Sequence, residues 1–140
     1  MQITKLVLDN FSSYEGKTVF DLRVKEKKPV ILIGGQNGAG KTSIFTAIKI
    51  ALYGPLAFGY TGYNAFYSKK IKGYINDRAF QTNPFSSGVT VELKIKKERE
   101  TKRYAISRKW SIIDSKIEED HRIFENGREI GYSETLLFDS

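Results

Sequence analysis

Cysteine is absent from this sequence, which excludes disulfide bridges and thiolate metal sites. Histidine occurs once, at His121, so a histidine metal cluster or a hydrolytic triad has no support, and we expect a structural role for this side chain on a strand or hairpin. No apolar run approaches the roughly 18–20 residues that a membrane-spanning helix needs. The opening residues, MQITKLVLDNF, lack the apolar core of a secretory signal, so we expect a cytoplasmic protein.

The charge of the chain is positive and unevenly distributed. The 140 residues carry a net charge of +7 and fit a single domain. Residues 91–110 contain eight Lys and Arg against three Asp and Glu, whereas residues 111–140 contain three against eight. A basic block followed by an acidic one indicates oriented contacts, and nucleic acid is a natural partner for the basic block. A solvated strand face explains the same charges equally well.

Apolar periodicity predicts a mixed α/β fold. Alternation predicts strands at 2–8, 18–24, 89–96, 103–110, 121–125 and 128–132, the last two joined by an Asn126-Gly127 hairpin turn. Residues 30–33 are apolar without alternation, which is typical of a central parallel strand. Residues 41–53 have helical spacing and end at Gly54-Pro55. Residues 56–88 are irregular, with one short helix around 63–71. We expect a core at 1–55, a loop region at 56–88 and antiparallel strands at 89–132.

A phosphate-binding motif stands between the predicted buried strand and the predicted helix. Residues 35–42 read GQNGAGKT, which matches G-x-x-x-x-G-K-[ST]. Glycines allow backbone N–H groups to approach phosphate oxygens, and the helix N-terminus adds unpaired donors. We expect Lys41 to contact the β- and γ-phosphates as the catalytic cation, and the Thr42 hydroxyl to bind Mg²⁺. The predicted nucleotide-binding residues are Gly35, Gln36, Asn37, Gly38, Ala39, Gly40, Lys41, Thr42 and Ser43.

Two stretches carry a resemblance to a known family. MQITKLVLDNFSSYEGKTVFDL and PVILIGGQNGAGKTSIFTAIKIALYG resemble the N-terminal lobe of SMC-like ABC-type ATPase heads, which have a P-loop NTPase fold. That group includes the SMC proteins, the double-strand-break repair ATPases, RecF and the DNA sulfur-modification ATPase DndD. Within the group, the segment GGQNGAGKTSIFTAIKIALYG is most similar to DndD. The resemblance covers residues 1–54 and is looser over 89–132.

The resemblance implies a composite ATPase. In that group two heads sandwich two ATP molecules with Mg²⁺. The C-terminal lobe, separated by a long coiled coil, supplies a signature loop, a Walker B Asp-Glu pair and a switch histidine. The implied partners are this chain's own C-terminal lobe, a second head, DNA and further subunits of a DNA-processing complex. Repair-type members carry an arginine after Asn-Phe, where this chain has Ser12, so Ser12 and Ser13 are secondary nucleotide-binding candidates.

The carboxylate that would activate the attacking water is not evident in the sequence. Residues 135–139, TLLFD, superficially resemble a Walker B strand, but Ser140 follows where a glutamate is expected. An ordinary segment, such as the start of a helix, explains these residues better. We therefore expect that hydrolysis requires the second lobe. The alternatives are a small nucleotide or metabolite kinase, disfavoured because Arg78 is the only arginine between residues 24 and 98, and a DNA-binding module with a vestigial nucleotide site.

Two further groups of side chains invite a functional interpretation. Lys94, Lys96, Arg103 and Lys109 are expected to share a polar face that contacts the DNA backbone. Solubility, or pairing with nearby glutamates, is the alternative. The aromatic residues at 58–67 either cover adenine or pack the loop onto the core, and packing is the favoured interpretation.

Overall fold

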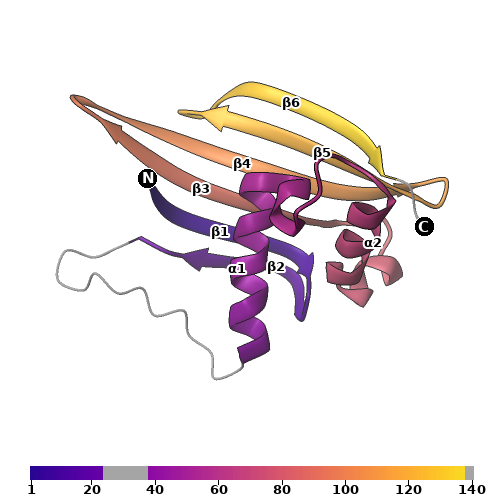
Figure 1. Ribbon diagram of the computed structural model, residues 1–140. Coiled ribbons are helices and arrows are strands. Elements are labelled where there is room, and N and C mark those ends of the chain that lie inside the picture. Colours follow the sequence, from indigo (N-terminus) through magenta and orange to yellow (C-terminus); the bar gives the residue numbers. More distant parts are fainter. Residues whose placement is uncertain (24–37, 138–140) are drawn as a thin grey trace.

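The computed structural model describes residues 1–23 and 38–137 (Figure 1). The predicted strand at 30–33 and the motif residues Gly35, Gln36 and Asn37 lie outside this range. The elements in chain order are β1 (Gln2–Phe11), β2 (Tyr14–Asp21), α1 (Gly38–Tyr53), the 3-10 helix η1 (Gly54–Phe58), α2 (Ala65–Tyr74), the 3-10 helix η2 (Asp77–Gln81), β3 (Ser87–Lys97), β4 (Glu100–Ile113), β5 (Lys116–Glu125) and β6 (Arg128–Leu137).

The strands form one antiparallel six-stranded sheet in the order β2-β1-β3-β4-β5-β6. From β3 onward each strand forms a hairpin with the next, and β1 lies between β2 and β3. Asn126 and Gly127 form the predicted turn between β5 and β6, both with positive φ. Each of the six predicted strands overlaps one strand of the sheet; most are longer than predicted, whereas β2 ends at Asp21, before the predicted end at residue 24.

Helix α1 covers one face of the sheet, as Figure 1 shows. Its apolar stripe, which includes Ile44, Ala47 and Ile50, packs against Leu6, Val91 and their neighbours on the strands, and all of these side chains are at most 1% exposed. Full burial of an aliphatic side chain of this size stabilises the fold by roughly 1.5–3 kcal/mol. The part of the helix from Ile44 to Ala51 is therefore packed firmly against the sheet.

Three sequence-based expectations need correction. The predicted helix at 41–53 begins three residues earlier, at Gly38, so the last part of the glycine motif is already helical. The region 56–88 is better ordered than expected, because it holds α2 and η2 as well as the last residues of η1. Residues 135–137 do not start a helix but belong to β6, and residues 138–140 lie outside the described range.

The described helices are too short or too polar to cross a bilayer, α1 being the longest of them at 16 residues.

Candidate nucleotide site

The first turn of α1 is built from the phosphate-binding motif. Gly38, Ala39, Gly40 and Lys41 have helical backbone, followed by Thr42 and Ser43 in the same helix. The first backbone N–H groups of a helix have no intrahelical acceptor and carry a partial positive charge. No acidic residue stands in this first turn to oppose an anion. The end of α1 therefore offers the donor set that a phosphate chain requires.

The turn between β1 and β2 lies against this end of α1. Ser12 Oγ is 2.7 Å from Ser43 Oγ, which is nearly buried. Ser12 has a φ of 54° and is held on both sides, because its N–H donates to Tyr74 O at 2.5 Å and its carbonyl accepts from Asn76 Nδ2 at 2.7 Å. Ser12 is thus brought next to the motif, whereas Ser13 is an exposed turn residue.

A polar hollow of about 380 Å³ opens beside Ser12. The residues that line it are Ser12, Glu15, Gly73, Ile75, Asn76, Asp77, Arg78 and Gln81. Six of them come from residues 73–81, which run from the end of α2 through η2 and to which the sequence analysis assigned no role. One local signal was present: the Asn76 side chain caps η2 by accepting from Arg78 N–H at 2.9 Å.

The residues of this site fit ATP with Mg²⁺. The phosphate chain would meet the N–H groups of the first turn of α1, and Thr42 is an exposed hydroxyl residue in that helix, where it would serve as a metal ligand. Within residues 1–23 and 38–137, no cluster of three or more His, Asp or Glu side chains forms a separate metal site. The backbone of Lys41, the candidate catalytic cation, lies in the first turn of α1.

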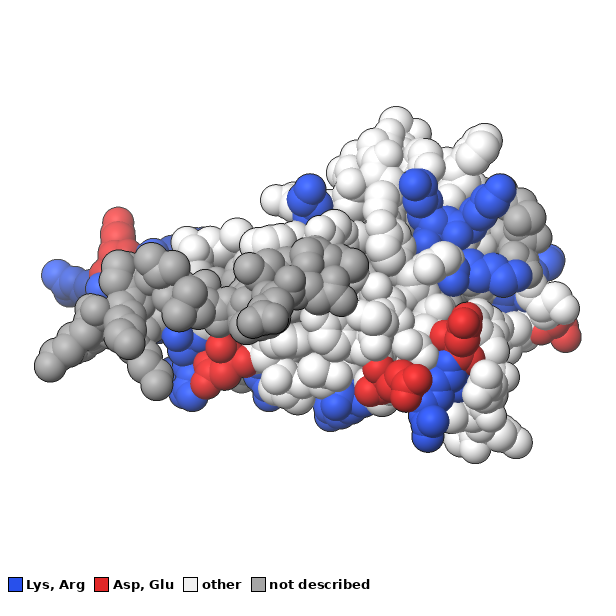
Figure 2. All heavy atoms as spheres, turned by 90° about the horizontal axis from the view of Figure 1, so that it is seen from below, with Lys and Arg blue, Asp and Glu red and all other residues white. Residues whose placement is uncertain are grey.

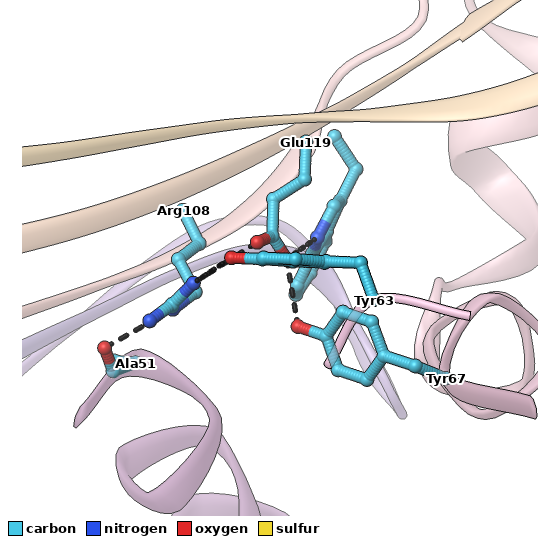
Figure 3. Close-up of polar contacts among 6 residues, drawn as sticks. Ala51, Tyr63, Tyr67, Arg108 and Glu119 are labelled. Atoms are coloured by element: carbon cyan, nitrogen blue, oxygen red, sulfur yellow. Dashed lines mark hydrogen bonds and ion pairs between the residues drawn. The ribbon is translucent and has the colours of Figure 1, made fainter. Parts of the chain in front are cut away.

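The opposite end of α1 is held by a buried ion pair that sequence reasoning missed (Figure 3). Arg108 Nη1 donates to Glu119 Oε2 at 2.9 Å, and both residues are less than 5% exposed. Arg108 Nε also donates to Ala51 O, in the last turn of α1, at 3.2 Å. A strand of the sheet is thereby bonded directly to the helix that begins with the motif.

Aromatic donors complete the shell around this ion pair. Tyr67 Oη and Trp110 Nε1 both donate to Glu119 Oε1, at 2.7 and 2.9 Å, while Arg108 Nη1 donates to Tyr63 Oη at 2.9 Å. Burial, with the nearby Glu119 charge, raises the pKa of Tyr63 and strongly raises that of Tyr67, so both hydroxyls stay protonated. Every oxygen of the buried carboxylate is therefore bonded, as a charge in an apolar core requires.

Gly54 gives the guanidinium group its space. This residue has a φ of +58°, and a Cβ placed on it would lie 3.0 Å from three atoms of the Arg108 guanidinium group. Gly54 had been expected only as the end of the helix. In the structure it also allows the backbone of η1 to approach Arg108 closely.

The four predicted DNA-contacting residues share one face of the sheet. Lys94 pairs directly with Arg103, and Lys96 and Lys109 lie an even number of residues from them along β3 and β4 without a register shift. Val91 and Ile106 occupy the alternate positions, so the basic residues face away from α1. Hollows of about 410 and 570 Å³ lie next to Arg103.

Acidic residues accompany the basic ones on the same face. Lys5 forms an exposed ion pair with Glu92 at 3.4 Å, and Asp120 lies directly opposite Lys109. The positive charge is therefore concentrated at the β3–β4 hairpin and diluted toward β5. The remaining candidate, His121, lies opposite Arg108 on the α1 side, where partial burial and the Arg108 charge lower its pKa.

The aromatic residues at 58–67 mostly pack onto the core, as the favoured interpretation predicted. Tyr67 is fully buried, and Phe58, Tyr60 and Tyr63 pack partly buried against the core. Phe66 differs, since it is 69% exposed.

Comparison with known proteins identifies the relatives of this fold. A family model described as an AAA domain matches residues 5–137. The SbcC protein of nuclease SbcCD from Vibrio cholerae is 43% identical over 54 residues, which make up 39% of this chain and 5% of that protein. The SbcC proteins from Staphylococcus haemolyticus and Lactococcus lactis are each 41% identical, over 54 and 49 residues, or 39% and 35% of this chain and 5% of each relative.

The chain spans about one twentieth of the length of these relatives. The matches support the ATPase family that was predicted from residues 1–54, while none of them distinguishes DndD within it. Since the family model extends over nearly all of the sequence, this chain belongs to the AAA domain family.

Proposed function

We propose that this chain is the ATP–Mg²⁺-binding N-terminal lobe of an SMC-like ATPase that acts in DNA repair, restriction or modification. Hydrolysis would require a C-terminal lobe and association with a second head. The sequence of residues 34–54, which resembles that of DndD, favours DNA sulfur modification as the specific process. The cytoplasm is the compartment in which such a protein would meet DNA.

The observation that carries this proposal is the start of α1 within the motif. A match to GQNGAGKT becomes a phosphate site only when its last residues open a helix, and here they do. The Ser12–Ser43 contact adds a polar wall from the β1–β2 turn. Family membership and the relatives from nuclease SbcCD point the same way.

A composite site explains what the described residues lack. In the sequence Ser140 stands where a glutamate would follow a Walker B strand, and Thr135–Leu137 form the end of β6 at the outer edge of the described sheet. An ATPase needs a group that orients the attacking water. A second lobe would supply that group, so we expect the 140 residues to bind ATP weakly and to hydrolyse it poorly.

The DNA part of the proposal rests on the shared face of Lys94, Lys96, Arg103 and Lys109. Lysine and arginine side chains on an open sheet face contact phosphates without reading bases. Such binding falls steeply with salt, with a slope of about −0.9 per neutralised phosphate on duplex DNA. We therefore expect little sequence preference from this face.

Nucleotide binding is tested by titrating a fluorescent ATP analogue with and without Mg²⁺ into the chain and into Lys41→Ala. The proposal predicts Mg²⁺-dependent binding that the variant loses by at least about tenfold, because a charge-assisted contact to the phosphates contributes roughly 1.5–3 kcal/mol. The exposed Lys49→Ala, in the middle of α1, is the matched control. Equal binding by wild type and Lys41→Ala would point to a vestigial nucleotide site.

Hydrolysis is tested by comparing the chain with a longer version that includes the C-terminal lobe. The composite-site model predicts a much higher turnover per head for the longer protein. Comparable steady-state turnover from both proteins would contradict it.

A further inference from the structure

Phe66 presents its ring to solvent on the outer side of α2. It is 69% exposed, although the other aromatic residues nearby pack onto the core. Its ring stacks on that of Tyr60, with centroids 6.1 Å apart and an interplanar angle of 27°. A hollow of about 460 Å³ beside the two rings is lined by Tyr60, Phe66, Lys69, Lys70, Gly73 and Tyr74. The ring pair forms one wall of an open groove.

The same surface is strongly basic. Helix α2 carries three lysines and no acidic residue. Lys69 and Lys70 are exposed and line the groove, and neither takes part in an ion pair among the residues that the structure describes. Lys70 Nζ lies 5.9 Å from the centroid of the Phe58 ring. Figure 2 shows several Lys and Arg side chains gathered at the end of the molecule where Figure 1 places α2.

The exposed aromatic pair and the two lysines together indicate which class of ligand the groove fits. Lysine is depleted at protein–protein interfaces, so two lysines beside an exposed aromatic pair disfavour a protein segment. A polyanion with flat rings satisfies both halves of the surface, because bases stack on aromatic faces and phosphates pair with ammonium groups. Bases inside a duplex already stack on one another. Single-stranded nucleic acid therefore fits best.

We propose that the α2 groove, defined by Tyr60, Phe66, Lys69 and Lys70, binds single-stranded nucleic acid by stacking and phosphate contacts. The site lies on a different element from the basic sheet face and from the start of α1. It thus goes beyond the proposed function and does not depend on ATP binding.

The test is fluorescence anisotropy of the full chain with a labelled oligo(dT) of about 20 nucleotides, at several salt concentrations. Removal of one stacking ring costs about 1–3 kcal/mol per base, so Phe66→Ala should weaken binding by about 5- to 150-fold. An oligomer of the same length without bases should bind wild type and Phe66→Ala equally. The control Phe80→Ala removes another exposed ring, 43% exposed and paired with Phe85 outside the groove, and should have no effect.

The phosphate half is tested with the double variant Lys69→Gln/Lys70→Gln. Each lost contact to a single strand should lower the salt slope by about 0.7, giving a fall of about 1.4 for two. Lys49→Gln, an exposed lysine of α1, should leave the slope unchanged. Far-UV circular dichroism confirms that each variant is folded, which is expected because the substituted side chains are exposed.

Three outcomes would overturn the proposal. The first is unchanged oligo(dT) affinity in Phe66→Ala. The second is an equal loss with the oligomer that lacks bases, which would exclude stacking. The third is loss of self-association or of partner binding in Phe66→Ala with intact oligo(dT) binding, which would make the groove a protein interface.

Discussion

The hydroxyl oxygen of Ser12 lies 2.7 Å from that of Ser43, so the β1–β2 turn touches the helix that begins within the GQNGAGKT motif. The turn thereby places a neutral hydroxyl group beside α1. Ser12 also joins the turn to Tyr74, the last residue of α2, and to Asn76, the residue before η2, through two hydrogen bonds. Ser12 therefore links the two parts of the chain that line the polar hollow, the β1–β2 turn and residues 73–81.

Removing the Ser12 hydroxyl should weaken nucleotide binding modestly. As a proposed nucleotide contact, the Ser12 hydroxyl would contribute one hydrogen bond of about 0.5–1.5 kcal/mol to binding, so in Ser12→Ala the Kd for a fluorescent ATP analogue should rise by about 2- to 12-fold. Ser13→Ala, in the same turn but with an exposed side chain, is the control. Identical Kd values for Ser12→Ala and Ser13→Ala would show that the contact does not shape the site.

Breaking the buried ion pair should destabilise the fold strongly. Glu119→Gln leaves the Arg108 guanidinium without a counter-charge, and breaking a buried pair costs about 3–5 kcal/mol. Asp120→Asn alters the exposed pair with Arg122 instead and should cost no more than about 1 kcal/mol. Urea denaturation of both variants measures the difference. A Glu119→Gln loss as small as that of Asp120→Asn would mean that the pair is not desolvated in solution.

Gly54 and Gly59 allow a matched comparison. Both have positive φ, at 58° and 81°, where a side chain costs roughly 1–2 kcal/mol. A Cβ at Gly59 meets nothing within 4 Å, whereas one at Gly54 meets the Arg108 guanidinium at 3.0 Å. Gly54→Ala should therefore lower the free energy of unfolding more than Gly59→Ala. Equal losses would show that Arg108 moves aside without cost.

His121 should make stability depend on pH below neutrality. Partial burial and the positive charge of Arg108, its partner on the neighbouring strand, lower the pKa of His121 in the folded state below the ordinary value of 6.5. The nearby negative charges of Glu119 and Asp120 only partly offset this effect. The unfolded chain then binds the proton more readily, so stability falls as the pH drops below about 6.5. In His121→Gln this part of the slope should disappear. Unfolding midpoints measured between pH 7.5 and 5 test this, and parallel curves for the two proteins would contradict it.

Local patterns predicted the strands well because each alternation reports one buried face. The strands predicted at 2–8 and 89–96 lie within Gln2–Phe11 and Ser87–Lys97, and Asn126-Gly127 forms the two-residue turn that its sequence favours. Helix α2 was placed only roughly, since ten residues with a short apolar stripe give a weak signal. The usable clue was Asn64, the N-cap residue just before α2, whose side chain accepts a hydrogen bond from Tyr67 N–H.

The buried ion pair could not be predicted by the same means. Arg108 and Glu119 belong to a basic and an acidic block, and both read as surface charges in sequence. Only the pairing of β4 with β5 turns them toward α1 and toward each other. The available hint was that Arg108 stands two residues from Ile106 and two from Trp110, so on a strand all three side chains point to the same face.

Trp110 is the only tryptophan of the chain, and its indole N–H is bonded to the carboxylate that holds Arg108. Its emission therefore arises from inside the link between the sheet and the last turn of α1. Any event that strains that link, including nucleotide capture at the other end of the helix, would change the spectrum of a single fluorophore. Trp110 is thus a built-in fluorophore with which to measure, without a label, whether a change at the start of α1 reaches its last turn.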